Sequence, residues 1–261
     1  MPRGQGRLRS ALREKRRRGI FLLPSLLTTG NLFCGFLAII LATEGDYRWA
    51  ALTVLIAMVL DILDGKVARL TKTTTQFGVE FDSLADVVSF CVAPALLLYF
   101  WALAPLGRVG WLAAFLYVIC GAMRLARFNV LSGSGDRRYF LGLPTPAAAG
   151  VLVAIVLLFE KIELARAELF VLSVVVYLLA LLMISSFRYH SFKELDFGRR
   201  RPLGVLLLVV LAVLIVASHP QLFLFLLFGI YALSGPARRL ILRKREPSAA
   251  QEEAASGELK G

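Results

Sequence analysis

The sequence predicts an all-α protein that crosses a membrane about eight times. Hydrophobic residues make up 58% of the 261 residues and charged residues only 18%, whereas the apolar share of a soluble domain is about 45–50%. Apolar stretches of about 16 to 23 residues recur from Phe21 to Ser234, and a helix needs roughly 20 such residues to cross the hydrocarbon core of a bilayer. The basic residues also collect on alternate connections between these stretches, as they do in polytopic membrane proteins.

Eight candidate spans follow one another along the chain. They cover approximately residues 20–43, 47–69, 82–104, 107–130, 145–161, 165–187, 202–218 and 220–235. The last two are short and are separated only by a turn at His219 and Pro220, so seven spans is the alternative count. We therefore expect a basic cytoplasmic segment over residues 1–19, a membrane-embedded domain over 20–235, and a cytoplasmic tail over 236–261 that is basic and then disordered.

The basic residues predict the orientation of the chain. Of the 30 Lys and Arg residues, 26 lie in the N-terminal segment, in the connections after the second, fourth and sixth spans, and in the C-terminal tail. The opposite connections hold only Arg48, Arg108, Lys161 and Arg166. The positive-inside rule then places both termini in the cytoplasm, and it accounts for the net charge of +12 without a nucleic-acid partner. We expect an integral, multi-pass protein of a bacterial-type inner membrane.

The N-terminal segment itself has two interpretations. The stretch RGQGRLRSALREKRRRG from Arg3 is similar to the charged start of a signal peptide, but the apolar run after it is too long and shows no small-residue cleavage site. We expect it to be retained, either as a topology signal or as a basic helix that lies on anionic lipid headgroups.

Four aspartates between residues 61 and 86 interrupt the apolar pattern of the second and third spans. Asp61 and Asp64 stand three residues apart at the cytoplasmic end of the second span, and Asp82 and Asp86 stand four apart in the third. These spacings place each pair on one helix face. Because a Thr-rich loop of about a dozen residues joins the two spans, we expect antiparallel neighbours whose acidic stripes face each other.

These carboxylates predict a cation site. A carboxylate within a membrane span costs several kcal/mol unless it is paired, hydrated or bound to a cation, and four together repel one another. Oxygen ligands without nearby His or Cys favour Mg²⁺, Mn²⁺ or Ca²⁺. Such an ion binds phosphates, and Arg69 offers the fork geometry that suits a phosphate oxygen. Gly65, Ala68 and Gly78 would let a ligand approach the helix backbone closely.

Two alternatives stay open at this stage. The aspartates could act as helix caps and interfacial salt-bridge partners of Lys66, Arg69 and Lys72. They could also form the site of a cation-coupled or proton-coupled transporter, although such sites usually lie near the bilayer midplane and this cluster lies at one interface.

The same stretch resembles a known family. Its spacing reproduces the pattern D-x2-D-G-x2-A-R-x8-G-x3-D-x3-D of the CDP-alcohol phosphotransferases, and the matching residues are Asp61, Asp64, Gly65, Ala68, Arg69, Gly78, Asp82 and Asp86. The resemblance implies a six-helix membrane core, a divalent-metal site and assembly as a homodimer. It also implies an activity, the transfer of a substituted phosphate from a CDP-linked lipid to an alcohol with release of CMP.

The resemblance also implies roles for single residues. It makes Asp61, Asp64 and Asp82 metal ligands, with Mg²⁺ or Mn²⁺ as the expected ion and Ca²⁺ as an alternative occupant. It places Asp86 at the metal as well, where it acts as the base on the incoming hydroxyl. We further expect a CDP-lipid pocket, and the residues assigned to it are Asn31, Gly65, Ala68, Arg69 and Gly78. For Asn31, bonding to a neighbouring helix is the alternative.

Other segments indicate which alcohol accepts the phosphate group. They are LPSLLTTGNLFCGFLAI from Leu23, RLARFNVLSG from Arg124, FLGLPTPAAAG from Phe140 and SSFRYHSFKEL from Ser185. Their order resembles the phosphatidylserine synthase branch of the family, which implies CDP-diacylglycerol and L-serine as substrates and phosphatidylserine and CMP as products. Glycerol 3-phosphate, an inositol phosphate and choline are the alternative acceptors.

Serine carries a carboxylate that needs a cationic partner. Arg124 and Arg127 lie three residues apart on one helix face, at the expected depth of the aspartates. We assign them to the serine site together with Asn129. Snorkelling of the two arginines to the interface and capping of a helix end by Asn129 are the alternatives.

Overall fold

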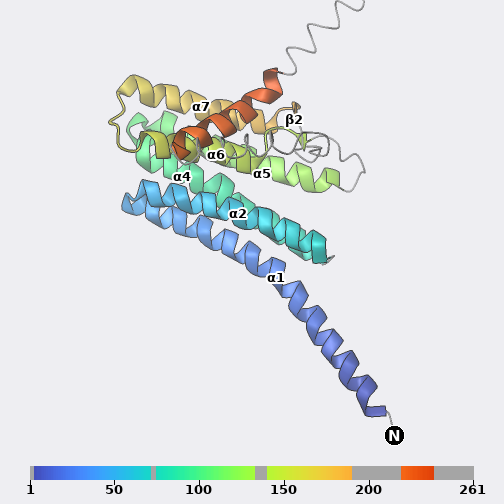
Figure 1. Ribbon diagram of the computed structural model, residues 1–261. Helices are drawn as coiled ribbons and strands as arrows, with labels where there is room; N and C mark the ends of the chain where they lie inside the picture. The colour runs from blue at the N-terminus through green and yellow to red at the C-terminus, as the bar shows by residue number, and fades with distance from the viewer. Residues whose placement is uncertain (1–2, 72–74, 133–139, 190–218, 238–261) are drawn as a thin grey trace, which may run out of the picture.

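A computed structural model describes residues 3–71, 75–132, 140–189 and 219–237. The predicted span over residues 202–218 and almost all of the tail lie outside these residues. Two long helices come first, α1 (Arg3–Glu44) and α2 (Tyr47–Thr71). They reverse direction at Gly45, whose φ of 88° favours glycine, and they pack side by side (Figure 1). Because α1 is continuous, the expected N-terminal segment and the first span belong to one helix.

The third span is a single helical stretch with irregular turns. It consists of α3 (Gln76–Asp86), the π-helix η1 (Val87–Val92), α4 (Ala93–Leu98), the π-helix η2 (Tyr99–Leu103) and the 3₁₀ turn η3 (Ala104–Leu106). It begins six residues earlier than predicted, because the side chain of Thr75 caps α3 by accepting a hydrogen bond from the Gly78 N–H at 3.0 Å. The expected loop of about a dozen residues is therefore wrong, and α3 starts close to the end of α2.

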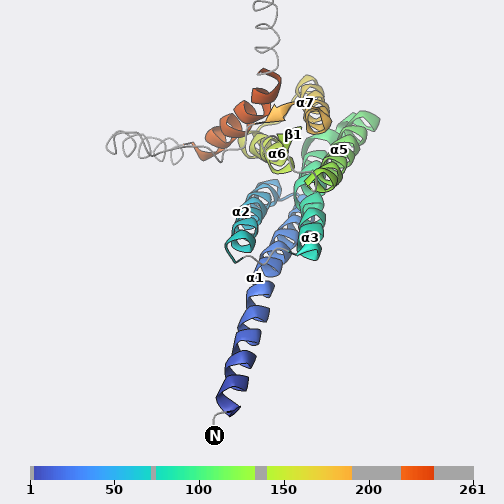
Figure 2. The same ribbon diagram turned by 90° about the vertical axis from the view of Figure 1, so that its right-hand side faces the viewer.

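The remaining helices form the second half of the fold. They are α5 (Arg108–Ser132), α6 (Thr145–Phe159), α7 (Arg166–Ile184) and the helix Pro220–Ala237. The short strands β1 (Phe140–Leu141) and β2 (Arg188–Tyr189) pair antiparallel, with Phe140 opposite Tyr189. As Figure 2 shows, α6 lies between α2 and the layer of α5 and α7.

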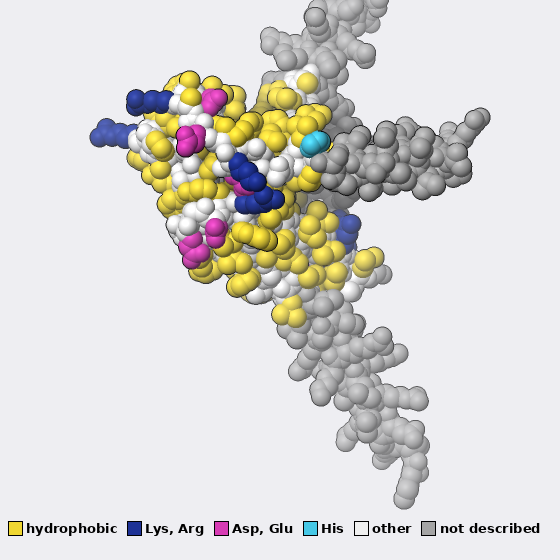
Figure 3. All heavy atoms as spheres, turned by 60° about the vertical axis from the view of Figure 1, so that its left-hand side comes forward, with side chains coloured by type: hydrophobic (Ala, Val, Ile, Leu, Met, Phe, Trp, Pro, Cys, Tyr) yellow, Lys and Arg dark blue, Asp and Glu magenta, His cyan; other side chains and the backbone are white. Residues whose placement is uncertain are grey.

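The described surface is largely apolar, as a lipid-facing surface should be. Five described helices are long and apolar enough to cross a membrane, and they cover residues 24–44, 76–106, 108–131, 166–184 and 220–237. The drawn face in Figure 3 is mostly hydrophobic, with few charged side chains. The predicted class, an all-α polytopic membrane protein, is confirmed. The exact number of eight spans stays a prediction.

Candidate active site

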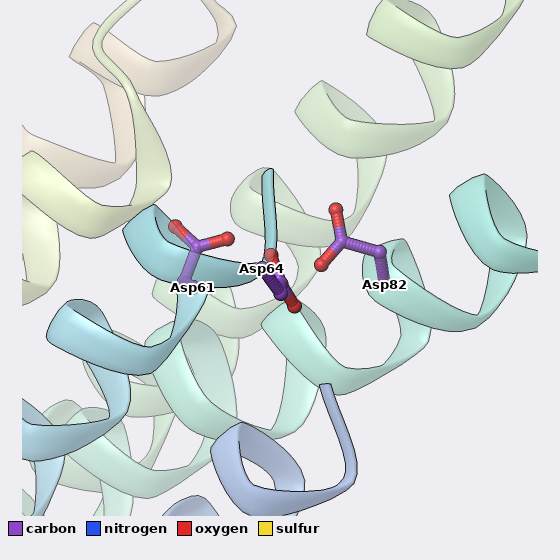
Figure 4. A group of neighbouring side chains, drawn as sticks. All are labelled: Asp61, Asp64 and Asp82. Atoms are coloured by element: carbon purple, nitrogen blue, oxygen red, sulfur yellow. The ribbon is translucent and has the colours of Figure 1, made fainter. Parts of the chain in front are cut away.

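Three of the four aspartates converge. Asp61 and Asp64 come from α2 and Asp82 comes from α3, and one carboxylate oxygen from each lies within 4.8 Å of the others (Figure 4). The two acidic stripes therefore face each other at the same depth. This arrangement follows from the helix spacings and from the short connection between α2 and α3.

The environment of these carboxylates fits a bound cation. Asp64 is buried and accepts a hydrogen bond from the Thr28 hydroxyl of α1 at 2.8 Å. Asp82 Oδ1 is buried and has no hydrogen-bond partner within the part of the chain that the structure describes. A buried oxygen without a donor is costly, and three clustered carboxylates repel one another. A hard divalent cation would relieve both problems.

Asp86 lies one helical turn beyond Asp82, at the end of α3, and it is not one of the three converging carboxylates. Only 8% of its surface is exposed. The side-chain amide of Asn31 on α1 donates a hydrogen bond to Asp86 Oδ1 at 3.1 Å. Ligation of the metal by Asp86 stays a prediction.

An open cavity of about 480 Å³ lies beside the three aspartates. This volume falls in the usual range for small-molecule sites, about 300–1,000 Å³. The cavity is lined from α1 by Pro24, Ser25 and Thr28, from α2 by Asp61, Ile62, Asp64, Gly65, Ala68 and Arg69, and at the start of the third span by Thr75, Gly78, Val79 and Asp82. Four of the five residues assigned to CDP-lipid binding therefore line one cavity.

The exception is Asn31, which is fully buried beside Asp86 and is not among the lining residues. The cavity lies between α1, α2 and the start of the third span. The third wall comes from α1, because α1 packs along α2 and turns Thr28 toward Asp64. Thr28 lies outside the aspartate motif, so the motif spacing gives it no role.

Arg69 and Gly65 lie on the α2 wall of the cavity. The Arg69 Nε–H donates to the backbone carbonyl of Gly65 at 2.8 Å, which holds the guanidinium against α2 and uses one of its five N–H donors. A Cβ atom at Gly65 would meet no heavy atom within 4 Å. A side chain there would occupy space that a ligand can use.

The three residues predicted to bind serine have separate surroundings. Arg124 is buried, and its Nη1 donates to the Thr145 hydroxyl at 3.4 Å. Arg127 Nη1 reaches the backbone carbonyl of Ile184 at 3.5 Å. Asn129 donates to Ser83 of α3 at 3.0 Å. A shared serine site for these residues remains a prediction.

Comparison with known proteins identifies the family. Residues 21–184 match the model of the CDP-alcohol phosphatidyltransferase family. The chain belongs to this family. This chain is 41% identical to a Helicobacter pylori protein named CDP-diacylglycerol–serine O-phosphatidyltransferase, over 85% of this chain and 93% of that protein. It is also 38% identical to the Archaetidylserine synthase of Methanothermobacter thermautotrophicus, over 68% of this chain and 73% of that protein.

A Mycobacterium tuberculosis protein, also named CDP-diacylglycerol–serine O-phosphatidyltransferase, is 40% identical over 54% of this chain and 52% of its own length. Membership in a family of phosphatidyltransferases, together with the five long apolar helices, makes this protein an integral membrane enzyme. It does not favour the transporter that the aspartate cluster left open.

Proposed function

We propose that this protein transfers the phosphatidyl group from CDP-diacylglycerol to L-serine and so produces phosphatidylserine and CMP. The observation that carries the proposal is the convergence of Asp61, Asp64 and Asp82 on a cavity that four further motif residues line, namely Gly65, Ala68, Arg69 and Gly78. The relatives support serine as the acceptor. The bacterial and archaeal names differ in the lipid, yet both contain serine.

The bonds that form and break in this reaction, and the proton that moves, define what the residues must do. The serine hydroxyl oxygen forms a bond to the phosphorus that carries diacylglycerol, the bond from this phosphorus to the CMP oxygen breaks, and the hydroxyl proton goes to a base. Asp86 is the proposed base, since it is a carboxylate one turn from the cation site and most of its surface is buried.

Asp61, Asp64 and Asp82 would hold Mg²⁺ or Mn²⁺. When bound, such an ion neutralises the diphosphate and the departing phosphate charge. The chain itself prepares the site, because the Thr28 hydroxyl fixes one oxygen of Asp64 and so orients the carboxylate before the ion enters.

The remaining motif residues would bind the nucleotide part. The guanidinium of Arg69 can donate to phosphate oxygens with the N–H groups that its bond to Gly65 leaves over. Because Gly65 and Ala68 have no side chain or a small one, they leave space for the ligand between Arg69 and the backbone of α2. Gly78 stays small because a Cβ there would approach the Thr75 hydroxyl to 3.2 Å, the same group that caps α3.

The lipid would reach this cavity from the bilayer while serine arrives from the cytoplasm. This geometry follows from the predicted orientation, in which both termini and the aspartate end of α2 face the cytoplasm of a bacterial-type cell. Arg124, Arg127 and Asn129 are the proposed contacts for serine, and Arg124 suits its carboxylate best, since it is a buried cation on α5. We also propose a homodimer.

The test measures CMP release from CDP-diacylglycerol by the purified protein in detergent micelles with Mn²⁺. Each acceptor is supplied in turn, namely L-serine, glycerol 3-phosphate, inositol phosphate and choline. We expect release to depend on serine and to be at background with the other three. Release that depends on another acceptor, with none from serine, would refute serine as the substrate while keeping the chemistry.

A further inference from the structure

Asn31 is a polar side chain in the apolar part of α1, and none of its surface is exposed. Its amide nitrogen lies 3.1 Å from Asp86 Oδ1. The two residues are 55 positions apart in the sequence, so the contact joins α1 to the end of α3. Because a carboxylate accepts hydrogen bonds, the side-chain nitrogen is the atom of Asn31 that must face it.

The contact is held in register by a second interaction. Ser89 in the π-helix η1, three residues after Asp86, donates its hydroxyl to the Asn31 backbone carbonyl at 2.9 Å. One turn further along α1, a Cβ atom at Gly35 would lie 2.7 Å from the Ser89 Cα atom. Glycine at this position therefore lets α1 approach η1 closely, which fixes the distance between Asn31 and Asp86.

The environment of Asn31 does not match a purely structural bond between helices. Its Oδ1 is buried, and the described residues provide no hydrogen-bond partner for it. A side chain selected only to join helices would satisfy both ends of the amide. Asn31 also lies away from the cavity lining. The one interaction that its side chain makes in the described structure is with the proposed base.

We propose that Asn31 is a positioning residue for Asp86. It fixes Oδ1 and with it the plane of the carboxylate, so that Oδ2 is left to receive the proton of the acceptor hydroxyl. This role rests on the proposed function of Asp86, and it replaces the contact with CDP-lipid that the sequence suggested for Asn31. Without the amide, the carboxylate rotates, and fewer substrate encounters find it aligned.

The test compares Asn31→Leu, which keeps the approximate shape and removes the donor, with wild type. We expect kcat to fall roughly tenfold or more, while KM for CDP-diacylglycerol and the Mn²⁺ concentration for half-maximal rate stay within about twofold. Asn31→Ser keeps a small hydroxyl donor and should recover part of kcat. Thr43→Ala is the control on the same helix, since the Thr43 hydroxyl donates to the Ile40 carbonyl of that helix, and it should leave kcat unchanged.

A double-mutant cycle separates positioning from general packing. If Asn31 acts through Asp86, adding Asn31→Leu to Asp86→Asn should reduce the residual rate by less than twofold. A KM for CDP-lipid that rises as much as kcat falls, or a full additional loss in the Asp86→Asn background, would overturn the proposal. If Asn31→Leu does not yield folded protein, the same cycle is run with Asn31→Ala, which also removes the donor. These ratios are measured with whichever acceptor supports CMP release, so failure of serine as substrate is a separate outcome.

Discussion

Helices α2 and α6 lie side by side, yet they differ in the polarity and the burial of their side chains. The α2 helix has 25 residues, and its last three turns carry Asp61, Asp64 and Arg69 on the wall of an open cavity. The α6 helix has 15 residues, most of them buried apolar side chains, and one buried polar side chain, Thr145. The α2 helix carries charged side chains on a cavity wall, whereas the α6 helix is largely buried within the protein.

The two helices therefore have different roles: the surroundings of α6 stabilise the fold, and α2 carries residues of the candidate active site. Around α6, close packing of small and branched side chains stabilises the structure. Near the C-terminal end of α2 and at the end of α3, the buried carboxylates of Asp64 and Asp86 accept hydrogen bonds from α1 side chains, an arrangement that costs stability unless a cation is bound. Substitutions near α2 should therefore change the reaction, and those near α6 should change the stability.

The largest effect is expected from Asp86→Asn, which keeps the shape of the side chain and removes the proposed base. Turnover should fall at least roughly a hundredfold, the usual scale for a lost general base, while binding of CDP-lipid in the presence of Mn²⁺ persists. CMP release and CDP-lipid binding are measured on the same preparation. Near-normal turnover would remove Asp86 from this role.

Asp82→Asn should mainly affect the metal requirement. Asp82 Oδ1 is the buried oxygen without a described partner, so losing its charge weakens the cation site directly. We expect the Mn²⁺ concentration for half-maximal rate to rise about 30- to 100-fold. This is the upper part of the range seen when a group that only hydrogen-bonds a metal ligand is lost. Asp46→Asn is the matched control, because Asp46 is exposed at the opposite end of α2. An equal response of both variants would contradict the site.

Thr28→Val should have a smaller effect on the same property. It keeps the shape of Thr28 and removes the hydroxyl that orients Asp64 at 2.8 Å. The Mn²⁺ requirement should rise about tenfold, as expected when an indirect partner of a metal ligand is lost. Thr29→Val is the control, since the neighbouring hydroxyl donates to the carbonyl of Ser25 in its own helix; a matching rise there would show that the change is general.

Gly150→Ala tests the other side of the comparison. A Cβ atom at Gly150 in α6 would lie 2.6 Å from the ring of Phe228 on the helix Pro220–Ala237, so the ring must move. We expect a loss of about 1–3 kcal/mol in stability, seen as a lower unfolding temperature, with kcat per folded molecule within about twofold. Gly229→Ala, which meets no atom within 4 Å, should change neither. A large loss of kcat in Gly150→Ala would contradict the view that packing around α6 affects stability and not the reaction.

Much of the fold was predictable because apolar runs long enough to cross a bilayer are local features. The aspartate triad was predictable for the same reason, since three- and four-residue spacings set a helix face before any tertiary contact forms. The start of α3 was missed because the Thr75 cap outweighs the threonine-rich composition around it.

The contacts from α1 could not be predicted in detail. Thr28 and Asn31 meet Asp64 and Asp86 at separations of 36 and 55 residues, and sequence spacing within α1 carries no information on which helix it packs against. The π-helical turn after Asp86, which carries Ser89 to α1, is also set by tertiary packing rather than by local preference.

The most direct test of the account follows isotopically labelled L-serine into lipid by wild-type protein and by Asp86→Asn, with CDP-diacylglycerol and Mn²⁺. Wild type should form labelled phosphatidylserine and CMP in equal amounts, and Asp86→Asn should form both at least roughly a hundredfold more slowly. CMP release without labelled lipid, or equal labelling by the two proteins, would contradict it.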